Sequence, residues 1–294
     1  MTWLITGGSG QLGISLSEQL NKLGIQFSAP SSSDLDITDA ANVQGLITVL
    51  NPAVIVNCAA WTDVDKAETK ESEAFSVNAQ GAENVAVSAR SCGAKLIHIS
   101  TDYVFSGDTE SPWAIRDERS PISAYGRTKL AGEEKVMNAS SEGTLLLRTS
   151  WLYSPWKKNF MKTVLRLASE SSNQIAMVDD QTGQPTSAID LADRIVEMAM
   201  SPIKCGIFHG TNSGEATWFD FAHEIMRING DDVTRLKRVS SQESRRVAQR
   251  PMYSVLDNSN WKDYGLPPLR DWKLALEQTM NTLNLNGDES SIDA

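Results

Sequence analysis

Short apolar runs alternate with amphipathic helical segments through the first half of this chain of 294 residues. The apolar runs predict strands at residues 2–6, 25–29, 53–57, 96–100 and 145–147. The segments between them predict helices at residues 11–23, 43–50, 73–91 and 125–137. Strands that are apolar throughout are buried on both faces, and helical connections make neighbouring strands parallel. We therefore expect an α/β fold with a doubly wound parallel sheet.

The first predicted strand ends in a glycine-rich turn, TGGSGQLG at residues 6–13, which leads directly into the first helix. Gly7, Gly10 and Gly13 recur at every third position. Glycine permits a tight turn and lets the backbone approach a pyrophosphate, which then lies at the positive N-terminus of the helix. A plain glycine turn is the alternative, but the strand, turn and helix context favours a Rossmann-type dinucleotide site.

The residues after the second predicted strand leave the choice between NADPH and NADH open. An acidic residue there would hold a ribose 2′-hydroxyl, and a basic residue would favour a 2′-phosphate. The chain has APSSS at residues 29–33, with carboxylates only at Asp34 and Asp36 and no Lys or Arg nearby. Either cofactor fits this segment.

The alternation weakens beyond Trp151, where helices are predicted at residues 159–168, 191–200, 218–229 and 272–283. We expect a dinucleotide-binding domain over residues 1–150, to which later segments return. Residues 151–285 are expected to form mainly a smaller, mixed α/β lobe that binds the substrate. Residues 286–294 are acidic and contain serine, which is typical of a disordered tail.

The net charge of −10, from 27 basic and 37 acidic residues, argues against nucleic acid and anionic membrane surfaces as partners. Cys58, Cys92 and Cys205 show no CxxC spacing, and the three histidines are isolated, so neither a disulfide framework nor a metal site is expected. No signal peptide is visible, and no apolar stretch is long enough for a membrane span. These features indicate a cytoplasmic protein.

Tyr125 and Lys129 are four residues apart in a predicted helix and therefore lie on one face. A nearby ammonium favours the phenolate and lowers the pKa of a tyrosine from about 10 toward neutrality. The spacing alone is common by chance. Thr101 strengthens the interpretation because it ends a predicted strand, where ligands bind in open parallel sheets. These three residues predict acid–base chemistry at a carbonyl group.

Several segments together resemble the extended short-chain dehydrogenase/reductase family, in the branch that reduces 4-keto nucleotide sugars. They are TGGSGQLG (6–13), VIVNCAAWTDVDKAE (54–68), STDYVFSG (100–107), AYGRTKLAGE (124–133), LRTSWLY (147–153), DDQTGQPTS (179–187) and RPMYSVLDNSNW (250–261). Related sugar dehydratases carry an acidic residue in place of Tyr103. The resemblance reaches to about residue 283 and therefore covers nearly the whole chain.

The resemblance implies a role for each matched residue. Cofactor contacts are expected from Gly7, Gly10, Gln11, Leu12, Gly13, Asp36, Ile37, Ala59, Ala60, Trp61, Tyr125 and Lys129. Substrate contacts are expected from Thr101, Asp102, Trp151 and Arg250. Thr101, Tyr125 and Lys129 form the implied catalytic set. Tyr125 donates the proton, and Lys129 holds the nicotinamide ribose and tunes Tyr125. A bidentate guanidinium such as that of Arg250 suits a nucleotide diphosphate.

The implied reaction is NADPH- or NADH-dependent reduction of the 4-keto group of dTDP-4-dehydro-6-deoxy-L-mannose, which gives dTDP-L-rhamnose. Two alternatives stay open: an epimerase or reductase for another NDP-4-keto sugar, and a non-catalytic regulatory subunit with the same fold. Some family members are dimers bridged by magnesium through glutamates, whose positions here hold Ser15 and Ile189. Neither side chain is a good magnesium ligand. We therefore expect no metal site, and either a monomer or a homodimer formed by another surface.

Overall fold

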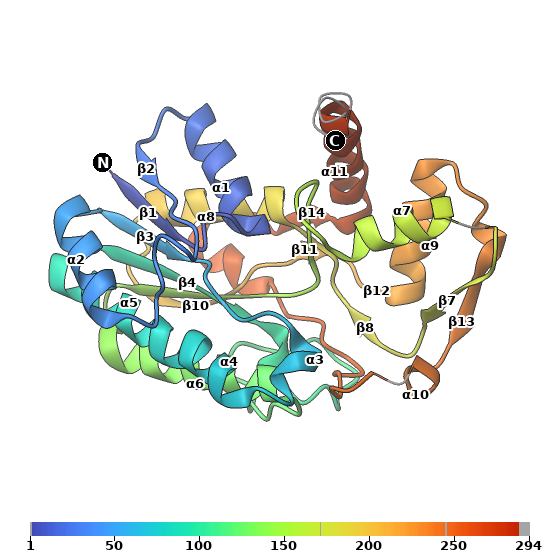
Figure 1. Ribbon diagram of the computed structural model, residues 1–294, viewed down its shortest axis with the longest axis horizontal. Coiled ribbons are helices and arrows are strands. Elements are labelled where there is room, and N and C mark those ends of the chain that lie inside the picture. The colour runs from blue at the N-terminus through green and yellow to red at the C-terminus, as the bar shows by residue number, and fades with distance from the viewer. Residues whose placement is uncertain (1, 171, 245, 288–294) are drawn as a thin grey trace.

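Six parallel strands form the central sheet of the larger lobe (Figure 1). In spatial order they are β10 (Gly206–His209), β5 (Thr144–Thr149), β4 (Lys95–Thr101), β3 (Val54–Asn57), β1 (Trp3–Thr6) and β2 (Phe27–Ser28). The computed structural model describes residues 2–170, 172–244 and 246–287. The chain runs from β1 outward to β2 and then crosses to β3 on the other side of β1. The direction of strand order therefore reverses between β1 and β3. Ligands bind at such a switch point.

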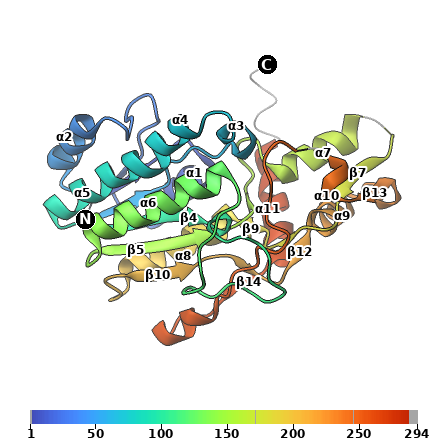
Figure 2. The same ribbon diagram turned by 90° about the horizontal axis from the view of Figure 1, so that it is seen from below.

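Helices cover both faces of the sheet, as Figures 1 and 2 show. One face carries α1 (Gln11–Lys22) and α8 (Ala188–Met200); the other carries α2 (Ala40–Leu50), α5 (Ala82–Cys92) and α6 (Ala124–Ser140). Side chains alternate along a strand. Trp3 and Ile5 therefore pack in the cluster under α1 and α8, whereas Leu4 packs in the cluster under α2 and α5. The predicted doubly wound parallel sheet is confirmed.

The predicted helix at residues 73–91 is interrupted by a π-helical turn. The structure has α4 (Glu71–Phe75), then η1 (Ser76–Gly81) in π geometry, and then α5. Within the π turn, the Asn78 amide accepts from the Trp61 N–H at 2.8 Å and donates to the Thr128 hydroxyl at 3.0 Å. This turn ties the loop after β3 to helix α6, and π turns of this kind are frequent at functional sites.

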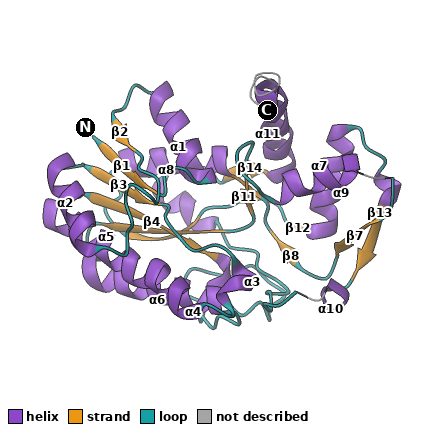
Figure 3. Cartoon of the chain, in the orientation of Figure 1, coloured by secondary structure: helices purple, strands orange, loops and turns teal. Residues whose placement is uncertain are grey.

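The smaller lobe is formed mainly by α7 (Phe160–Glu170), α9 (Trp218–Asn229) and α11 (Trp272–Gly287), with short strand pairs (Figure 3). The pairs are β6 (Leu152–Tyr153) with β9 (Thr186–Ser187), β7 (Ile175–Val178) with β13 (Leu236–Val239), β8 (Thr182–Gly183) with β12 (Ala216–Thr217), and β11 (Asn212–Ser213) with β14 (Leu269–Asp271). Helix α8 and strand β10 return to the larger lobe, so the chain crosses between lobes several times.

The remaining short elements lie in connecting segments. They are α3 (Val64–Ala67), α10 (Ser241–Ser244) and the 3₁₀ turns η2 (Asp102–Val104), η3 (Val233–Arg235) and η4 (Ser259–Tyr264). Helix α11 continues through residue 287, so the first two residues of the predicted tail are helical. The rest of that tail, residues 288–294, lies outside the described residues. Within the described parts of the chain, no helix is both long enough and apolar enough to cross a membrane.

Candidate active site

A cleft of about 810 Å³ is lined by the glycine loop, the ends of β3 and β4, the start of α6 and residues of the smaller lobe. A volume of this size suits a small-molecule ligand. Most residues predicted for the site line it. They are Gly7, Gly10, Gln11, Leu12, Gly13, Asp36, Ile37, Ala59, Ala60, Thr101, Asp102, Tyr125, Lys129 and Trp151. Two predicted residues, Trp61 and Arg250, lie outside this lining.

The glycine loop packs so closely that side chains would collide with the backbone. Gly7 has a φ of +68°, and a Cβ on it would lie 2.8 Å from the backbone nitrogen of Ala59. A Cβ on Gly13 would lie 2.5 Å from the Gly7 carbonyl oxygen. Helix α1 begins after Gly10, and no described side chain caps it. Its first N–H groups therefore face the cleft edge and suit an anionic group such as a pyrophosphate.

One end of the cleft is suited to an adenosine. Ser32, Leu35, Asp36 and Ile37 line it. The Asp36 carboxylate accepts from the Thr38 N–H at 2.9 Å and from the Thr38 hydroxyl at 2.8 Å, which fixes its orientation. Ile37 is buried and supplies an apolar surface. The expected position of Asp36 and Ile37 beside the adenine stays a prediction that this arrangement supports.

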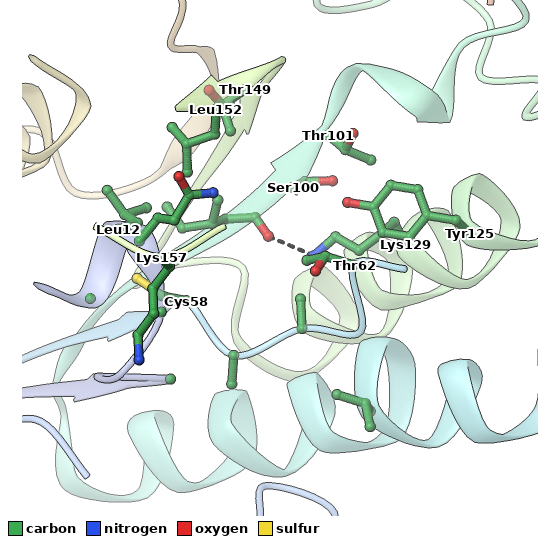
Figure 4. A pocket seen from close by; sticks show the side chains of 18 of the residues that line it. Leu12, Cys58, Thr62, Ser100, Thr101, Tyr125, Lys129, Thr149, Leu152 and Lys157 are labelled. Carbon is green, nitrogen blue, oxygen red and sulfur yellow. Dashed lines mark hydrogen bonds between the residues drawn. The ribbon is translucent and has the colours of Figure 1, made fainter. Parts of the chain in front are cut away.

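The other end of the cleft brings together Thr101, Tyr125 and Lys129 (Figure 4). Thr101 is the last residue of β4, and the other two lie on the first turns of α6. The Ser123 hydroxyl caps α6 by accepting from the Gly126 N–H at 3.2 Å. The Lys129 ammonium donates to the Ile99 carbonyl at 2.7 Å. In Figure 4, the phenol of Tyr125 and the ammonium of Lys129 point to the same side of the cleft.

Burial has the largest effect on the pKa values of Tyr125 and Lys129 at this end of the cleft. It raises the pKa of Tyr125 above its ordinary value; the Thr101 side chain opposes the shift and Asp102 adds to it. Burial also lowers the pKa of Lys129 to about 8. The net shift of the Tyr125 pKa is therefore upward, and the predicted lowering toward neutrality is not observed in this structure. The reason is that desolvation disfavours the phenolate, while the ammonium is held by Ile99.

The carboxyl of Asp102 lies behind Thr101 in the wall of the cleft. Thr101 donates to Asp102 at 2.9 Å, and Asp102 is almost fully buried. Burial raises the pKa of Asp102 to about 6, although hydrogen bonds from Ser254 and Thr101 oppose the shift. The hydrogen bond to Asp102 fixes the orientation of the Thr101 side chain.

Trp151 reaches the cleft from the connection after β5 in an uncommon backbone conformation, with a φ of +45°. It stacks on Trp218 with ring centroids 3.5 Å apart and an interplanar angle of 5°. A Cβ on Gly183 would lie 2.5 Å from the Trp151 ring, so this glycine makes room for the stack. Trp218 also lines the cleft, and the sequence analysis missed it. Its only sequence signal is an aromatic residue directly after a helix cap.

Trp61 lies behind the catalytic end. Its backbone N–H donates to Asn78, its indole donates to the Asp63 carbonyl, and its ring packs with Tyr125 against a small buried cluster. Trp61 therefore packs against the same small cluster as Tyr125 and is not among the residues that line the cleft.

Arg250 lines a second cavity of about 1380 Å³, which shares Val64, Tyr103 and Trp218 with the cleft. Its guanidinium forms two contacts with Asp65, at 3.2 and 3.1 Å, and interacts with the Tyr103 hydroxyl. The sequence analysis missed Asp65 as its partner.

The parallel sheet, the glycine cradle and the Thr, Tyr and Lys residues at one end of the cleft define a dinucleotide-dependent oxidoreductase of the Rossmann class. The profile of the RmlD substrate binding domain matches residues 1–285. The chain belongs to this family, which confirms the predicted relationship.

Named relatives cover almost the whole chain. A dTDP-4-keto-6-deoxy-D-glucose reductase of Streptomyces niveus is 42% identical over 98% of this chain and 99% of its own length. A dTDP-4-dehydrorhamnose reductase of Streptomyces griseus is 41% identical over 96% and 93% of the two chains. A crystal structure of dTDP-4-dehydrorhamnose reductase from Bacillus anthracis in complex with NADP has a TM-score of 0.92 at 37% identity, covering 96% of this chain and 99% of that chain.

Proposed function

We propose that this protein reduces the 4-keto group of dTDP-4-dehydro-6-deoxy-L-mannose to give dTDP-L-rhamnose, with NADPH or NADH as the reductant. The observation that carries the proposal is the meeting of Thr101, Tyr125 and Lys129 at the end of a cleft whose other end is a glycine cradle. Relatives at about 40% identity are named for the same reaction or for reduction of a related 4-keto sugar. The protein is further proposed to be cytoplasmic and to act as a monomer or homodimer.

The residues present fit a dinucleotide. Gly7 and Gly13 have no side chains, and their close packing allows only backbone atoms at these positions around the start of α1. Leu12, Ala59 and Ala60 supply small or apolar surfaces between this loop and the catalytic end. When bound, the reduced nicotinamide supplies the hydride that adds to C4 of the sugar.

Tyr125 supplies the proton that the reduction requires. Because its pKa is raised, the phenol is protonated at neutral pH and can donate to the sugar oxygen as that oxygen becomes negative. The Thr101 hydroxyl donates to Asp102 at 2.9 Å here, and it would turn from that partner to donate a hydrogen bond to the same oxygen. The phenolate left on Tyr125 is stabilised by Lys129, whose pKa of about 8 keeps the ammonium charged at pH 7.

The second cavity is suited to the nucleotide diphosphate of the substrate. Arg250 and Arg246 both lie near Asp65 in its wall, and Trp218 joins it to the cleft. A diphosphate that reached Arg250 would take over contacts that Asp65 makes here. A guanidinium with two parallel donors suits that exchange.

Turnover on a small panel of NDP-4-keto sugars tests the proposal. Oxidation of NADPH and NADH is followed with the L-mannose and the D-glucose forms of the dTDP-4-keto-6-deoxy sugar, and the products are identified by NMR. Faster turnover of the L-mannose form is expected. Faster turnover of the D-glucose form would favour the activity for which the Streptomyces niveus relative is named. Cofactor binding with no turnover on any sugar would instead indicate a regulatory subunit.

A further inference from the structure

The loop between β6 and α7 is tied to the glycine-loop helix of the other lobe. The Ser154 hydroxyl donates to the side-chain oxygen of Gln11 at 2.9 Å, and the Asn159 amide donates to the same oxygen at 3.0 Å. Gln11 is the first residue of α1. The loop therefore reaches the helix end at which a pyrophosphate would bind, although it belongs to the smaller lobe.

Lys157 lies in this loop in a left-handed conformation, with a φ of +58°. Residues other than glycine, asparagine and aspartate rarely adopt it. The Asn159 amide holds the turn by donating to the Ser154 carbonyl at 2.8 Å. Glycine or asparagine would fit this backbone conformation with less strain. The backbone conformation therefore does not explain why a lysine stands at this position. Strained positions of this kind cluster at functional sites.

The side chain of Lys157 lines the dinucleotide cleft. In Figure 4 its amine is directed away from Tyr125 and Lys129. It is exposed, and no ion pair joins it to a carboxylate among the residues that the structure describes. Its charge is therefore available to a ligand at the glycine-loop end of the cleft.

We propose that Lys157 binds the pyrophosphate of the dinucleotide, as a cation that the smaller lobe contributes across the cleft. This inference rests on the proposed function. The pyrophosphate is favoured over a 2′-phosphate because the loop is anchored to Gln11 at the start of α1, whereas Ser32 and Asp36 line the adenosine end. The segment after the second strand gives no signal for this cation, because Lys157 comes from the other lobe.

Titration of the protein with NADH and with NADPH, followed by calorimetry, tests this role without catalysis. Lys157→Asn removes the charge but tolerates the positive φ. It should weaken binding of both dinucleotides by about five- to tenfold, since a charge-assisted contact is lost. Lys157→Arg should bind nearly as the wild type does. Lys162→Gln, on α7 and outside the cleft lining, is the matched control and should change neither affinity. The difference between wild type and Lys157→Asn should shrink as salt is raised.

Three results would overturn the inference: unchanged affinity of Lys157→Asn for both dinucleotides, weaker binding of NADPH alone, or weaker binding of dTDP alone. The second would assign Lys157 to the 2′-phosphate and the third to the substrate. Thermal unfolding of the variant without ligand should match or exceed that of the wild type, which separates lost binding from lost folding. A wild-type protein that bound neither dinucleotide would overturn the proposed function itself.

Discussion

The phenol rings of Tyr103 and Tyr125 meet edge to face, with centroids 5.5 Å apart and an interplanar angle of 74°. Their hydroxyls have different partners. Tyr125 interacts with Thr101, whereas Tyr103 interacts with Arg250 in the adjoining cavity. Burial raises the pKa of both above the ordinary value, so both are protonated at neutral pH. We therefore expect different tasks for the two neighbouring phenols: proton donation by Tyr125 and substrate contact by Tyr103.

Tyr125→Phe should lower kcat by about a hundredfold or more, because general acid catalysis contributes about 10²–10⁴-fold. Its affinity for NADPH and NADH should stay close to that of the wild type. Tyr103→Phe is the matched control and should mainly raise the substrate KM. Steady-state kinetics with each variant measures both effects. If Tyr103→Phe lost most of kcat while Tyr125→Phe kept half of it, the two assignments would have to be exchanged.

Lys129 should make activity and stability respond to alkaline pH in opposite directions. Its pKa in the folded protein is lowered from 10.5 to about 8 by burial, so it loses its proton there before the unfolded chain does. Between these values the unfolded state binds more protons, and stability therefore rises with pH. Activity should fall over the same range, because the uncharged amine no longer stabilises the Tyr125 phenolate.

The pH effect is measured by chemical denaturation and by kcat/KM from pH 7 to 10, each for the wild type and for Lys129→Met. The difference in unfolding free energy between the two proteins isolates the contribution of Lys129. In Lys129→Met, the rise in unfolding free energy between pH 8 and pH 10 should vanish. The residual kcat/KM of the variant should no longer fall over this pH range. A wild-type activity that stays constant to pH 10 would contradict the proposed role of the ammonium.

Local patterns predicted the larger lobe because each element there is specified by neighbouring residues. The strand β1 is apolar on both faces, and the glycine spacing follows it directly. Tyr125 and Lys129 are related by helical geometry alone. By contrast, the π turn at Ser76–Gly81 was missed because hydrophobic periodicity continues through it, and its cause is the tertiary contact of Asn78 with Trp61 and Thr128.

The residues that sequence analysis missed belong to contacts between segments far apart in the chain. Lys157 reaches the cleft because its loop is bonded to Gln11, and Trp218 because it stacks on Trp151. Asp65 meets Arg250 across the two lobes. No spacing along the sequence reports such pairs. They follow only from the relative placement of the lobes, which many weak contacts determine together.

Arg250→Lys should weaken binding of dTDP by about five- to tenfold and leave dinucleotide binding unchanged. Lysine keeps the charge but loses the paired donors that suit a diphosphate. The side chain of Arg250 is 17% exposed, whereas that of Arg246 is 66% exposed in the same cavity. Arg246→Lys is therefore the control, and its effect should be small. Calorimetric titration with dTDP measures both, and equal affinity of wild type and Arg250→Lys would remove Arg250 from the site.

Glu133 on α6 and Arg148 on β5 form a buried ion pair, with each side chain 1% exposed and two contacts of 2.8 Å. Glu133→Gln leaves the guanidinium without its counter-charge and should destabilise the fold by about 3–5 kcal/mol. Glu83→Gln, in the more exposed pair with Lys135, should cost less than about 1 kcal/mol. Urea denaturation at pH 7 compares them. Similar costs for the two variants would show that the buried pair contributes little.

Because of the same ion pair, we expect the free energy of unfolding to decrease at acidic pH. Burial raises the pKa of Glu133, but Arg148, Ser100 and Arg119 outweigh it and hold the pKa below its ordinary value of 4.5. A depressed carboxyl pKa stabilises the fold above the unfolded value, and this contribution is lost as pH falls through the folded value. The stability gap between wild type and Glu133→Gln should therefore narrow below about pH 4.5. A gap that stayed constant down to the acid transition would contradict this assignment.

Turnover should not depend on magnesium, and magnesium should not bridge two copies of this chain. In some family members glutamates bridge magnesium, and the resemblance places Ser15 and Ile189 at their positions in this chain. The Ser15 hydroxyl is buried and donates to the Gln11 carbonyl at 2.9 Å, so it does not face a partner. The nearby carboxylate of Asp190 is occupied by Arg270, at 2.6 and 2.8 Å, and by the Asn212 amide at 2.7 Å.

A hard divalent cation would have to displace the Arg270 guanidinium before the Asp190 carboxylate could bind it. Sedimentation velocity and turnover are measured with excess EDTA, and again after magnesium is restored. We expect the same sedimentation coefficient and the same kcat in both conditions, whether the protein is a monomer or a dimer. A dimer that EDTA dissociates and magnesium restores would show that other carboxylates, with Glu18 as the exposed candidate on α1, have taken over the bridge.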